Sequence, residues 1–120
     1  MFNADQIAQR YIQFWNETDA AQRTQLAAHL WTDDAHYVDP LMQGQGSAQI
    51  TAMIGAVHQQ FPQHVFTLHG KPEGHHDRIR FSWTLAAPGQ APVAMGTDVG
   101  IVSQDGRLHG VTGFLDTLSA

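Results

Sequence analysis

Two aspartates and one tyrosine are the side chains of this sequence best suited to moving a proton. Asp98 lies among small and apolar residues in the segment 94–100, where loss of solvation favours the neutral form of a carboxyl near neutral pH. Asp39 stands before Pro40, where a better solvated carboxylate stays ionised and can act as a base. Tyr11 adds a phenol on an apolar helical stripe. Brought into one pocket, the two acids could divide the work of proton transfer.

Each of these residues also has a plain structural explanation. A tyrosine on an apolar stripe is often a core residue whose hydroxyl finds a backbone partner, and an aspartate before a proline is often a turn residue. Asp98 is the strongest candidate, because a carboxyl in the middle of a strand is unfavourable to bury without a role. Asp116 fits the end of the last strand better than it fits catalysis.

Other chemistries find little support. The sequence has no cysteine, which excludes disulfides and thiolate catalysis. Its eight histidines form no His-x-x-x-His or Glu-x-x-His pattern on an expected helix, so we expect no metal site. A nucleophile elbow, a P-loop and a dinucleotide fingerprint are all missing, so we expect an enzyme without a cofactor.

Composition bounds the size of the protein and its partners. The 120 residues, 42% of them hydrophobic, suit one domain over residues 1–120. The formal net charge is −5 and the six Lys and Arg residues are scattered, so we expect no nucleic acid partner. No stretch is apolar enough to span a bilayer, and the first residues lack the features of a signal peptide. We therefore expect no membrane association and a cytoplasmic location.

Three helices are expected in the first half of the chain. Apolar residues recur at helical spacing over residues 5–16. Alanine, glutamine and leucine favour a second, shorter helix over residues 20–30. Ser47 is expected to cap a third helix, whose apolar residues fall on one stripe and which Pro62 closes.

Strands fill the rest of the chain. A short strand over residues 36–38 must stop at Pro40, since proline cannot donate to a sheet ladder. Four longer strands follow the third helix and are separated by turns rich in Gly, Pro and Asp. They span residues 65–68, 78–85, 93–102 and 108–115. This order predicts an α+β fold with helices on one face of a curled sheet.

The strand over residues 93–102 has two different faces. One face collects small residues and one carboxyl, namely Ala94, Gly96, Asp98 and Gly100. Small side chains on a concave face leave room for a ligand beside that carboxyl. The other face carries Val93, Met95, Val99 and Ile101. Because an apolar outer face usually needs a partner, we expect a homodimer through the outer face of the sheet.

Four short motifs carry a resemblance to a known family. They are Gln9-Arg10-Tyr11, then Asp33-Asp34-Ala35 leading to Asp39-Pro40, then Gly46-Ser47-Ala48, and finally Gly96-Thr97-Asp98. In order and spacing the chain resembles ketosteroid isomerases and the wider group of SnoaL-type polyketide cyclases over nearly its whole length. The resemblance implies a cone-shaped nuclear transport factor 2-like fold, with three N-terminal helices packed on a curved antiparallel or mixed sheet.

The resemblance also implies roles for the three candidates. In ketosteroid isomerases a tyrosine of the first helix and a protonated aspartic acid of a late strand bind the enolate oxygen, while an aspartate before a proline moves the proton. Tyr11, Asp98 and Asp39 lie at the matching positions. The chain departs from that pattern in its third helix, where Met53-Ile54-Gly55 stands in place of a further tyrosine. In SnoaL-type cyclases the acid-base is also a strand aspartate, and Asp98 matches it without help from Tyr11.

The expected function is proton transfer, cyclisation or hydration on a small apolar carbonyl or epoxide compound, with Asp39 as base and Asp98 with Tyr11 as oxyanion donors. Five further residues are expected to line the substrate pocket: Trp15, His36, Met53, Trp83 and Phe114. Two alternatives stay open. One is a module that only holds a small apolar ligand or a partner chain, and the other is a dimerisation domain whose core is filled.

Overall fold

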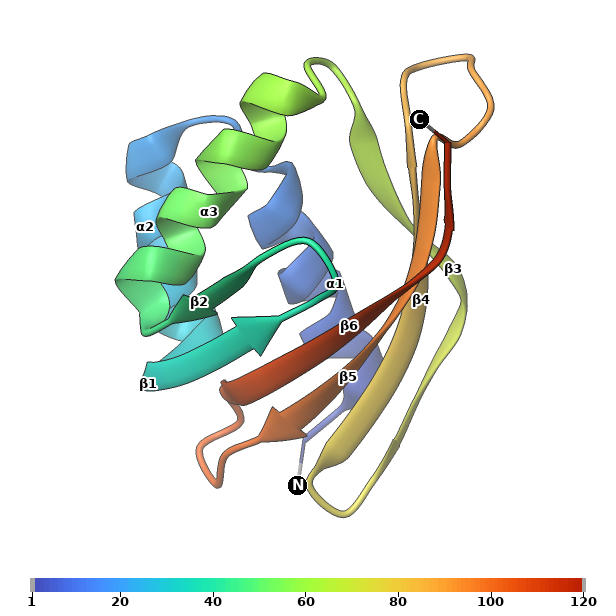
Figure 1. Ribbon diagram of the computed structural model, residues 1–120. Helices are drawn as coiled ribbons and strands as arrows, with labels where there is room; N and C mark the ends of the chain where they lie inside the picture. The colour runs from blue at the N-terminus through green and yellow to red at the C-terminus, as the bar shows by residue number, and fades with distance from the viewer. Residues whose placement is uncertain (1, 120) are drawn as a thin grey trace.

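Three helices and a six-stranded sheet form the structure, a computed structural model that describes residues 2–119. The helices are α1 (Ala4–Asn16), α2 (Ala20–Leu30) and α3 (Ser47–Gln60). The strands are β1 (Trp31–Val38), β2 (Gln43–Gln45), β3 (Val65–His75), β4 (Arg78–Ala86), β5 (Ala94–Val102) and β6 (Leu108–Leu118). Figure 1 shows the helices gathered on one side of a strongly curved sheet, which confirms the predicted α+β class. Within the described residues, no helix has the length and apolar character needed to cross a membrane.

The sheet brings together residues that lie far apart in the sequence. Its strand order is β2-β1-β6-β5-β4-β3. β1 runs parallel to β6, and every other neighbouring pair is antiparallel, so the sheet is mixed. The register pairs Tyr37 of β1 with Val111 of β6, and Gly113 of β6 with Asp98 of β5. The end of β1 therefore approaches Asp98 across one intervening strand.

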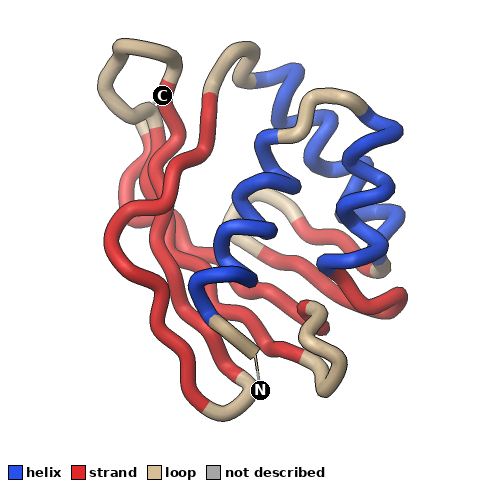
Figure 2. The backbone as a smooth tube through the Cα atoms, turned by 180° about the vertical axis from the view of Figure 1, so that it is seen from behind, coloured by secondary structure: helices blue, strands red, loops and turns tan. Residues whose placement is uncertain are grey.

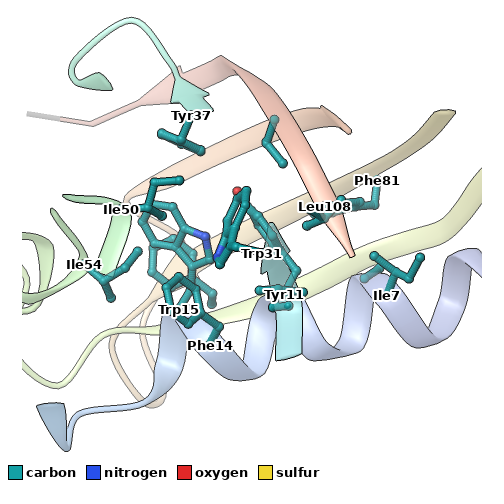
Figure 3. Close-up of a cluster of buried hydrophobic side chains, with 14 of the residues drawn as sticks. Ile7, Tyr11, Phe14, Trp15, Trp31, Tyr37, Ile50, Ile54, Phe81 and Leu108 are labelled. Atoms are coloured by element: carbon teal, nitrogen blue, oxygen red, sulfur yellow. The ribbon is translucent and has the colours of Figure 1, made fainter. Parts of the chain in front are cut away.

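Helix α1 supplies the aromatic rings that fill the space between helices and sheet. Its buried residues are Ile7, Ala8, Tyr11, Phe14 and Trp15. The Tyr11 ring meets Phe81 of β4 edge-on at a centroid distance of 4.9 Å, and Phe14 meets Trp31 of β1 at 6.1 Å. Figure 3 shows these rings in the buried cluster, and Figure 2 shows α1 running beside the long strands. Close packing of the rings fixes the rotation of α1 and hence the direction of the Tyr11 hydroxyl.

Helix α3 begins differently from the prediction. Ser47 is its first residue and makes no capping hydrogen bond, while the N-cap is Gly46 with a φ of +86°. The Gly46 N–H donates to the Ala35 carbonyl of β1 at 2.6 Å. Glycine adopts this left-handed conformation without steric strain, whereas serine would not. The expectation that Ser47 caps the helix is therefore wrong, because the capping position is used to tie α3 to β1.

Several strands are longer than predicted. β3 continues through Gly70 and Pro72 because a bulge between His69 and Glu73 absorbs these residues into the strand. β1 begins earlier and β6 ends later than predicted. β2 was not predicted at all, since its sequence Gln-Gly-Gln is typical of a flexible turn.

The two faces of β5 follow the predicted alternation. Asp98 and the small residues of its face are buried, whereas Met95, Val99 and Ile101 on the opposite face are only half-buried. Val93 is the exception. It precedes β5, its N–H donates to the Leu85 carbonyl at 2.8 Å, and its side chain packs against the core.

Candidate active site

Asp98 is a buried carboxyl held by two side-chain donors. It is 2% exposed. The Tyr11 hydroxyl donates to its Oδ2 at 2.6 Å, and the Trp83 indole N–H donates to its Oδ1 at 3.1 Å. Both oxygens of the carboxylate thus have a fixed partner, one from α1 and one from β4.

Burial dominates the acidity of Asp98. Loss of solvation raises its pKa to about 6 from an ordinary value of 3.8. The hydrogen bonds from Tyr11 and Trp83 act in the opposite direction, because they stabilise the charged form. The negative charges of Asp39 and Asp116 raise the pKa further. Asp98 therefore changes its protonation close to neutral pH, as a general acid-base must.

A second carboxyl and phenol lie at the end of β1. The Tyr37 hydroxyl donates to Asp39 Oδ2 at 2.5 Å. The other oxygen of Asp39 accepts the backbone N–H groups of Leu41 at 2.8 Å and Met42 at 3.0 Å. Asp39 is thus both the turn residue that its place before Pro40 suggested and a member of a hydrogen-bonded pair.

Both phenols are held in their protonated form. Burial raises the pKa of Tyr11 well above 10.0, and the charge of Asp98 adds to this effect. Burial likewise raises the pKa of Tyr37, followed by the charges of Asp98 and Asp39. Each hydroxyl therefore stays protonated and donates a hydrogen bond to the neighbouring carboxylate.

The two pairs share one largely apolar pocket with a cavity volume of about 60 Å³. Tyr11, Asp39 and Asp98 all line it, together with Trp15 and Trp83. The other walls are largely apolar and include Phe66, Leu85 and Leu115. At the mouth, Leu41 is 61% exposed and Leu118 is 48% exposed. The three residues proposed from the sequence for catalysis thus converge on one volume, as do two of the five proposed for substrate binding.

Two inward-facing glycines make room for this arrangement. A Cβ on Gly96 would lie 2.3 Å from the Trp83 ring. The indole can therefore lie over residue 96 and reach Asp98 only because glycine has no side chain. A Cβ on Gly113 would lie 2.9 Å from Asp98 Oδ1, 3.2 Å from Asp39 Cβ and 3.3 Å from the Tyr37 hydroxyl. Gly113 therefore allows the two carboxyl groups to approach each other.

The sequence analysis did not identify Tyr37 or Gly113 as site residues. Tyr37 was detectable, since it stands two positions before Asp39 and thus shares its side of a strand. Gly113 was not, because its role depends on the register that pairs it with Asp98.

Three predicted lining residues lie outside the pocket, and their placement is corrected. His36 precedes the inward Tyr37 and therefore lies on the outer face, with its ring over Gly110. Phe114 follows the inward Gly113 and is 56% exposed. Met53 is half-buried on α3 and packs against the core, while Met42 lines the pocket instead. Among residues 2–119, no three His, Asp or Glu side chains gather as ligands for a metal ion.

Three helices on a curved mixed sheet, closed around a largely apolar pocket with a buried aspartate, define a nuclear transport factor 2-like protein. Residues 8–110 match the family model of the SnoaL-like domain, and the chain belongs to this family. The resemblance found in the sequence is thus confirmed at the level of the family. No curated protein matches the chain.

Solved structures agree with this assignment. The chain is 48% identical to a proposed isomerase of the SnoaL-like family from Agrobacterium tumefaciens str. C58, with 92% of this chain and 95% of that chain covered and a TM-score of 0.89. A proposed polyketide cyclase from Sinorhizobium meliloti is 16% identical, with 90% and 93% covered and a TM-score of 0.69. A nuclear transport factor 2-like protein of unknown function from Cytophaga hutchinsonii ATCC 33406 is 9% identical, with 97% and 92% covered and a TM-score of 0.69. The last two share the fold.

The buried carboxyl should make stability depend on pH in a specific way. A pKa raised from 3.8 to about 6 corresponds to about 3 kcal/mol. Asp98 is neutral in both folded and unfolded chains below about pH 4, and charged in both above about pH 6. Wild-type protein should therefore lose about 3 kcal/mol of stability from this group as pH rises through that window, and Asp98→Asn should not.

Urea unfolding of both proteins at pH 4, 5, 6 and 7 measures the difference. Asp33→Asn, which changes an exposed carboxyl on β1, serves as the control and should follow the wild type. Parallel curves for wild type and Asp98→Asn would show that the Asp98 carboxyl does not have a raised pKa.

The two donors to Asp98 should affect its titration unequally. Both stabilise the carboxylate, and Tyr11 has the larger effect. Tyr11→Phe should therefore raise the pKa of Asp98 by about one unit or more, and Trp83→Phe by less. Carboxyl ¹³C chemical shifts followed against pH report both values. An unchanged pKa in Tyr11→Phe would contradict the hydrogen bond.

Proposed function

We propose that this protein is an enzyme that moves a proton on a small, apolar carbonyl compound, in an isomerase or cyclase type of reaction that needs no cofactor. The observation that carries the proposal is Asp98, a buried carboxyl with a pKa of about 6 in a largely apolar pocket. A group with this pKa is substantially ionised at neutral pH and still basic enough to accept a proton from carbon. Membership of the SnoaL-like family supports the same reading.

The reaction uses Asp98 twice. Its carboxylate takes the proton from the carbon next to the carbonyl, which leaves an enolate. The resulting carboxylic acid then returns that proton to another carbon or to the oxygen, so the enzyme ends as it began. Tyr11 and Trp83 hold the carboxylate in one orientation throughout.

This assignment differs from the one implied by ketosteroid isomerases. There the aspartate before a proline is the base, but here Asp39 accepts three hydrogen bonds, from Tyr37, Leu41 and Met42. In the resting protein the Tyr11 hydroxyl is directed at Asp98. When Asp98 takes up a proton, Tyr11 no longer faces a charged acceptor and can donate to the enolate oxygen instead. Tyr11 thus acts as an oxyanion donor only after proton transfer.

Asp39 supports the reaction through its charge. It raises the pKa of Asp98, although burial is the larger cause. The Asp39 and Tyr37 pair also lines the pocket, where it can contact a second polar atom of the substrate. The cavity of about 60 Å³ is small, so we infer that only the reacting part of the substrate enters and that the remainder lies at the apolar mouth.

Deuterium exchange tests the proposal without knowledge of the product. Wild-type protein in D₂O should introduce deuterium next to the carbonyl of small cyclic ketones, followed by ¹H NMR. Asp98→Asn should lower the exchange rate at least 100-fold, the range expected for loss of a general base. Asp33→Asn, which changes an exposed carboxyl on β1, should retain activity. Exchange at the wild-type rate in Asp98→Asn would refute the role of Asp98.

The pH profile adds a second criterion. The rate for wild-type protein should rise with pH around the pKa of about 6, because the base must be ionised. Asp39→Asn should move this midpoint to lower pH, since the Asp39 charge raises the pKa of Asp98. A ligand that copurifies and is never turned over would instead favour a binding module. The apolar cavity argues against a domain with a filled core.

We also propose a homodimer through the outer face of the sheet. Met95, Val99 and Ile101 of β5 are half-buried on that face, and the neighbouring Phe114 of β6 is exposed. Sedimentation should give the mass of a dimer for wild-type protein. Val99→Asp should give a monomer because a charge is placed in an apolar interface. Ala52→Asp on the exposed side of α3 is the control and should remain dimeric, and a monomeric wild type would refute the interface.

A further inference from the structure

The loop that joins β1 to β2 forms part of the pocket wall and part of its mouth. It spans residues 39–42, and Figure 1 shows it as the turn between these two strands. Asp39, Leu41 and Met42 all line the pocket. Leu41 is largely exposed, whereas Met42 packs against the core. One short segment thus carries a carboxyl of the inner pocket and an apolar side chain of the mouth.

Asp39 holds this loop together with one of its two carboxylate oxygens. Its Oδ1 accepts the backbone N–H of Leu41 at 2.8 Å and that of Met42 at 3.0 Å. The Asp39 N–H donates in turn to the Met42 carbonyl at 2.9 Å. Pro40, which lies between them, has no N–H to contribute. The conformation of the loop therefore depends on the Asp39 side chain as well as on backbone pairing.

The second oxygen ties the same carboxyl to the buried part of the pocket. The Tyr37 hydroxyl donates to Asp39 Oδ2 at 2.5 Å, and the Tyr37 ring packs against Trp15 at a centroid distance of 5.5 Å. A Cβ on Gly113 of β6 would lie 3.2 Å from Asp39 Cβ, so the backbone of β6 lies close on another side. The Asp39 carboxyl is thus fixed by buried groups, and through Oδ1 it fixes the positions of Leu41 and Met42.

Asp105 provides a contrast within the same chain. It lies in the turn between β5 and β6, where its Oδ1 accepts from the Ser103 hydroxyl and from the Arg107 N–H. Its other oxygen accepts from the Arg107 side chain at 2.8 Å. Asp105 is exposed and does not line the pocket. Both aspartates hold a turn, but only Asp39 joins its turn to a buried phenol beside Asp98.

We propose that Asp39 is a positioning residue for substrate specificity, which holds Leu41 at the mouth against an aliphatic substituent of the substrate. The inference rests on the proposed function for the class of ligand, a ketone, and adds the part that lies outside the cavity. Burial of the exposed Leu41 surface by an aliphatic group favours binding. The cavity of about 60 Å³ has no room for the same group beside the reacting carbonyl.

Two substitutions separate the charge of Asp39 from its hold on the loop. In Asp39→Asn the amide oxygen can still accept the N–H groups of Leu41 and Met42, although the charge is lost. Asp39→Ala removes both the charge and the acceptor. Amide hydrogen exchange at Leu41 and Met42 should therefore be faster in Asp39→Ala than in wild type, and nearly unchanged in Asp39→Asn.

The affinities of cyclohexanone and 4-propylcyclohexanone test the proposal. Trp15 and Trp83 line the pocket, so tryptophan fluorescence reports binding. Wild-type protein should bind the propyl compound about 10-fold more tightly. Leu41→Ala and Asp39→Ala should each lower this preference to about 3-fold or less. Asp39→Asn should keep the wild-type preference, and so should Asp105→Ala, the matched loss of a turn aspartate.

A double variant shows whether Asp39 acts through Leu41. If it does, Leu41→Ala should lower the preference no further when Asp39 is already alanine. Effects of the two substitutions that simply add would overturn the proposal. An Asp39→Ala variant that keeps the wild-type preference would also overturn it, as would a wild type that does not distinguish the two ketones.

These affinities do not depend on turnover. A protein that shows the expected preference and its loss in Asp39→Ala, but exchanges no deuterium, would refute the proposed enzyme and leave the role of the loop intact. Conversely, deuterium exchange by a protein whose preference is the same in wild type and Asp39→Ala would leave the enzyme intact and refute the role of Asp39 in specificity.

Discussion

The hydrogen bond between Tyr11 and Asp98 is the interaction on which the site depends. It joins α1 to the sheet inside an apolar core, where a phenol and a carboxyl would each be unfavourable alone. The contact requires α1 to be rotated correctly, and the rings of Phe14 and Phe81 hold that rotation. It also stabilises the charged form of Asp98, which burial alone would suppress. This one contact thus links the position of α1 to the acidity of Asp98, although burial is the larger influence on its pKa.

The two carboxyl groups differ because their surroundings differ. Asp98 sits in the middle of β5 beneath the helices and has two side-chain donors. Asp39 stands beyond the end of β1, where two backbone N–H groups turn toward it. A strand interior offers no free backbone donors, since they are engaged in the ladder, whereas a strand end does. The topology therefore separates a carboxyl with a raised pKa from one bound by backbone amides, within a single cavity.

Much of this arrangement could be predicted from local patterns. Helical spacing identified α1 and placed Tyr11 on its buried stripe, and strand alternation placed Asp98 on the inner face of β5. Predictions failed where a side chain's direction depended on pairing between distant strands. Phe114 was expected inside, but the register of β6 with β5 turns Gly113 inward. Neither segment alone carries a sequence pattern that predicts the parallel pairing of β1 with β6. The approach of the end of β1 to Asp98 could therefore not be predicted.

Gly113 limits which residues of the pocket can be substituted. A Cβ on this residue would lie within 3.3 Å of atoms of Asp98, Asp39 and Tyr37, so even a methyl group there would displace the reactive groups. At the mouth, the side chains of Leu41 and Leu118 are 61% and 48% exposed and carry no hydrogen-bonding group. Substitutions intended to accommodate a new substrate are therefore best made at Leu41 and Leu118, whereas position 113 tolerates only glycine.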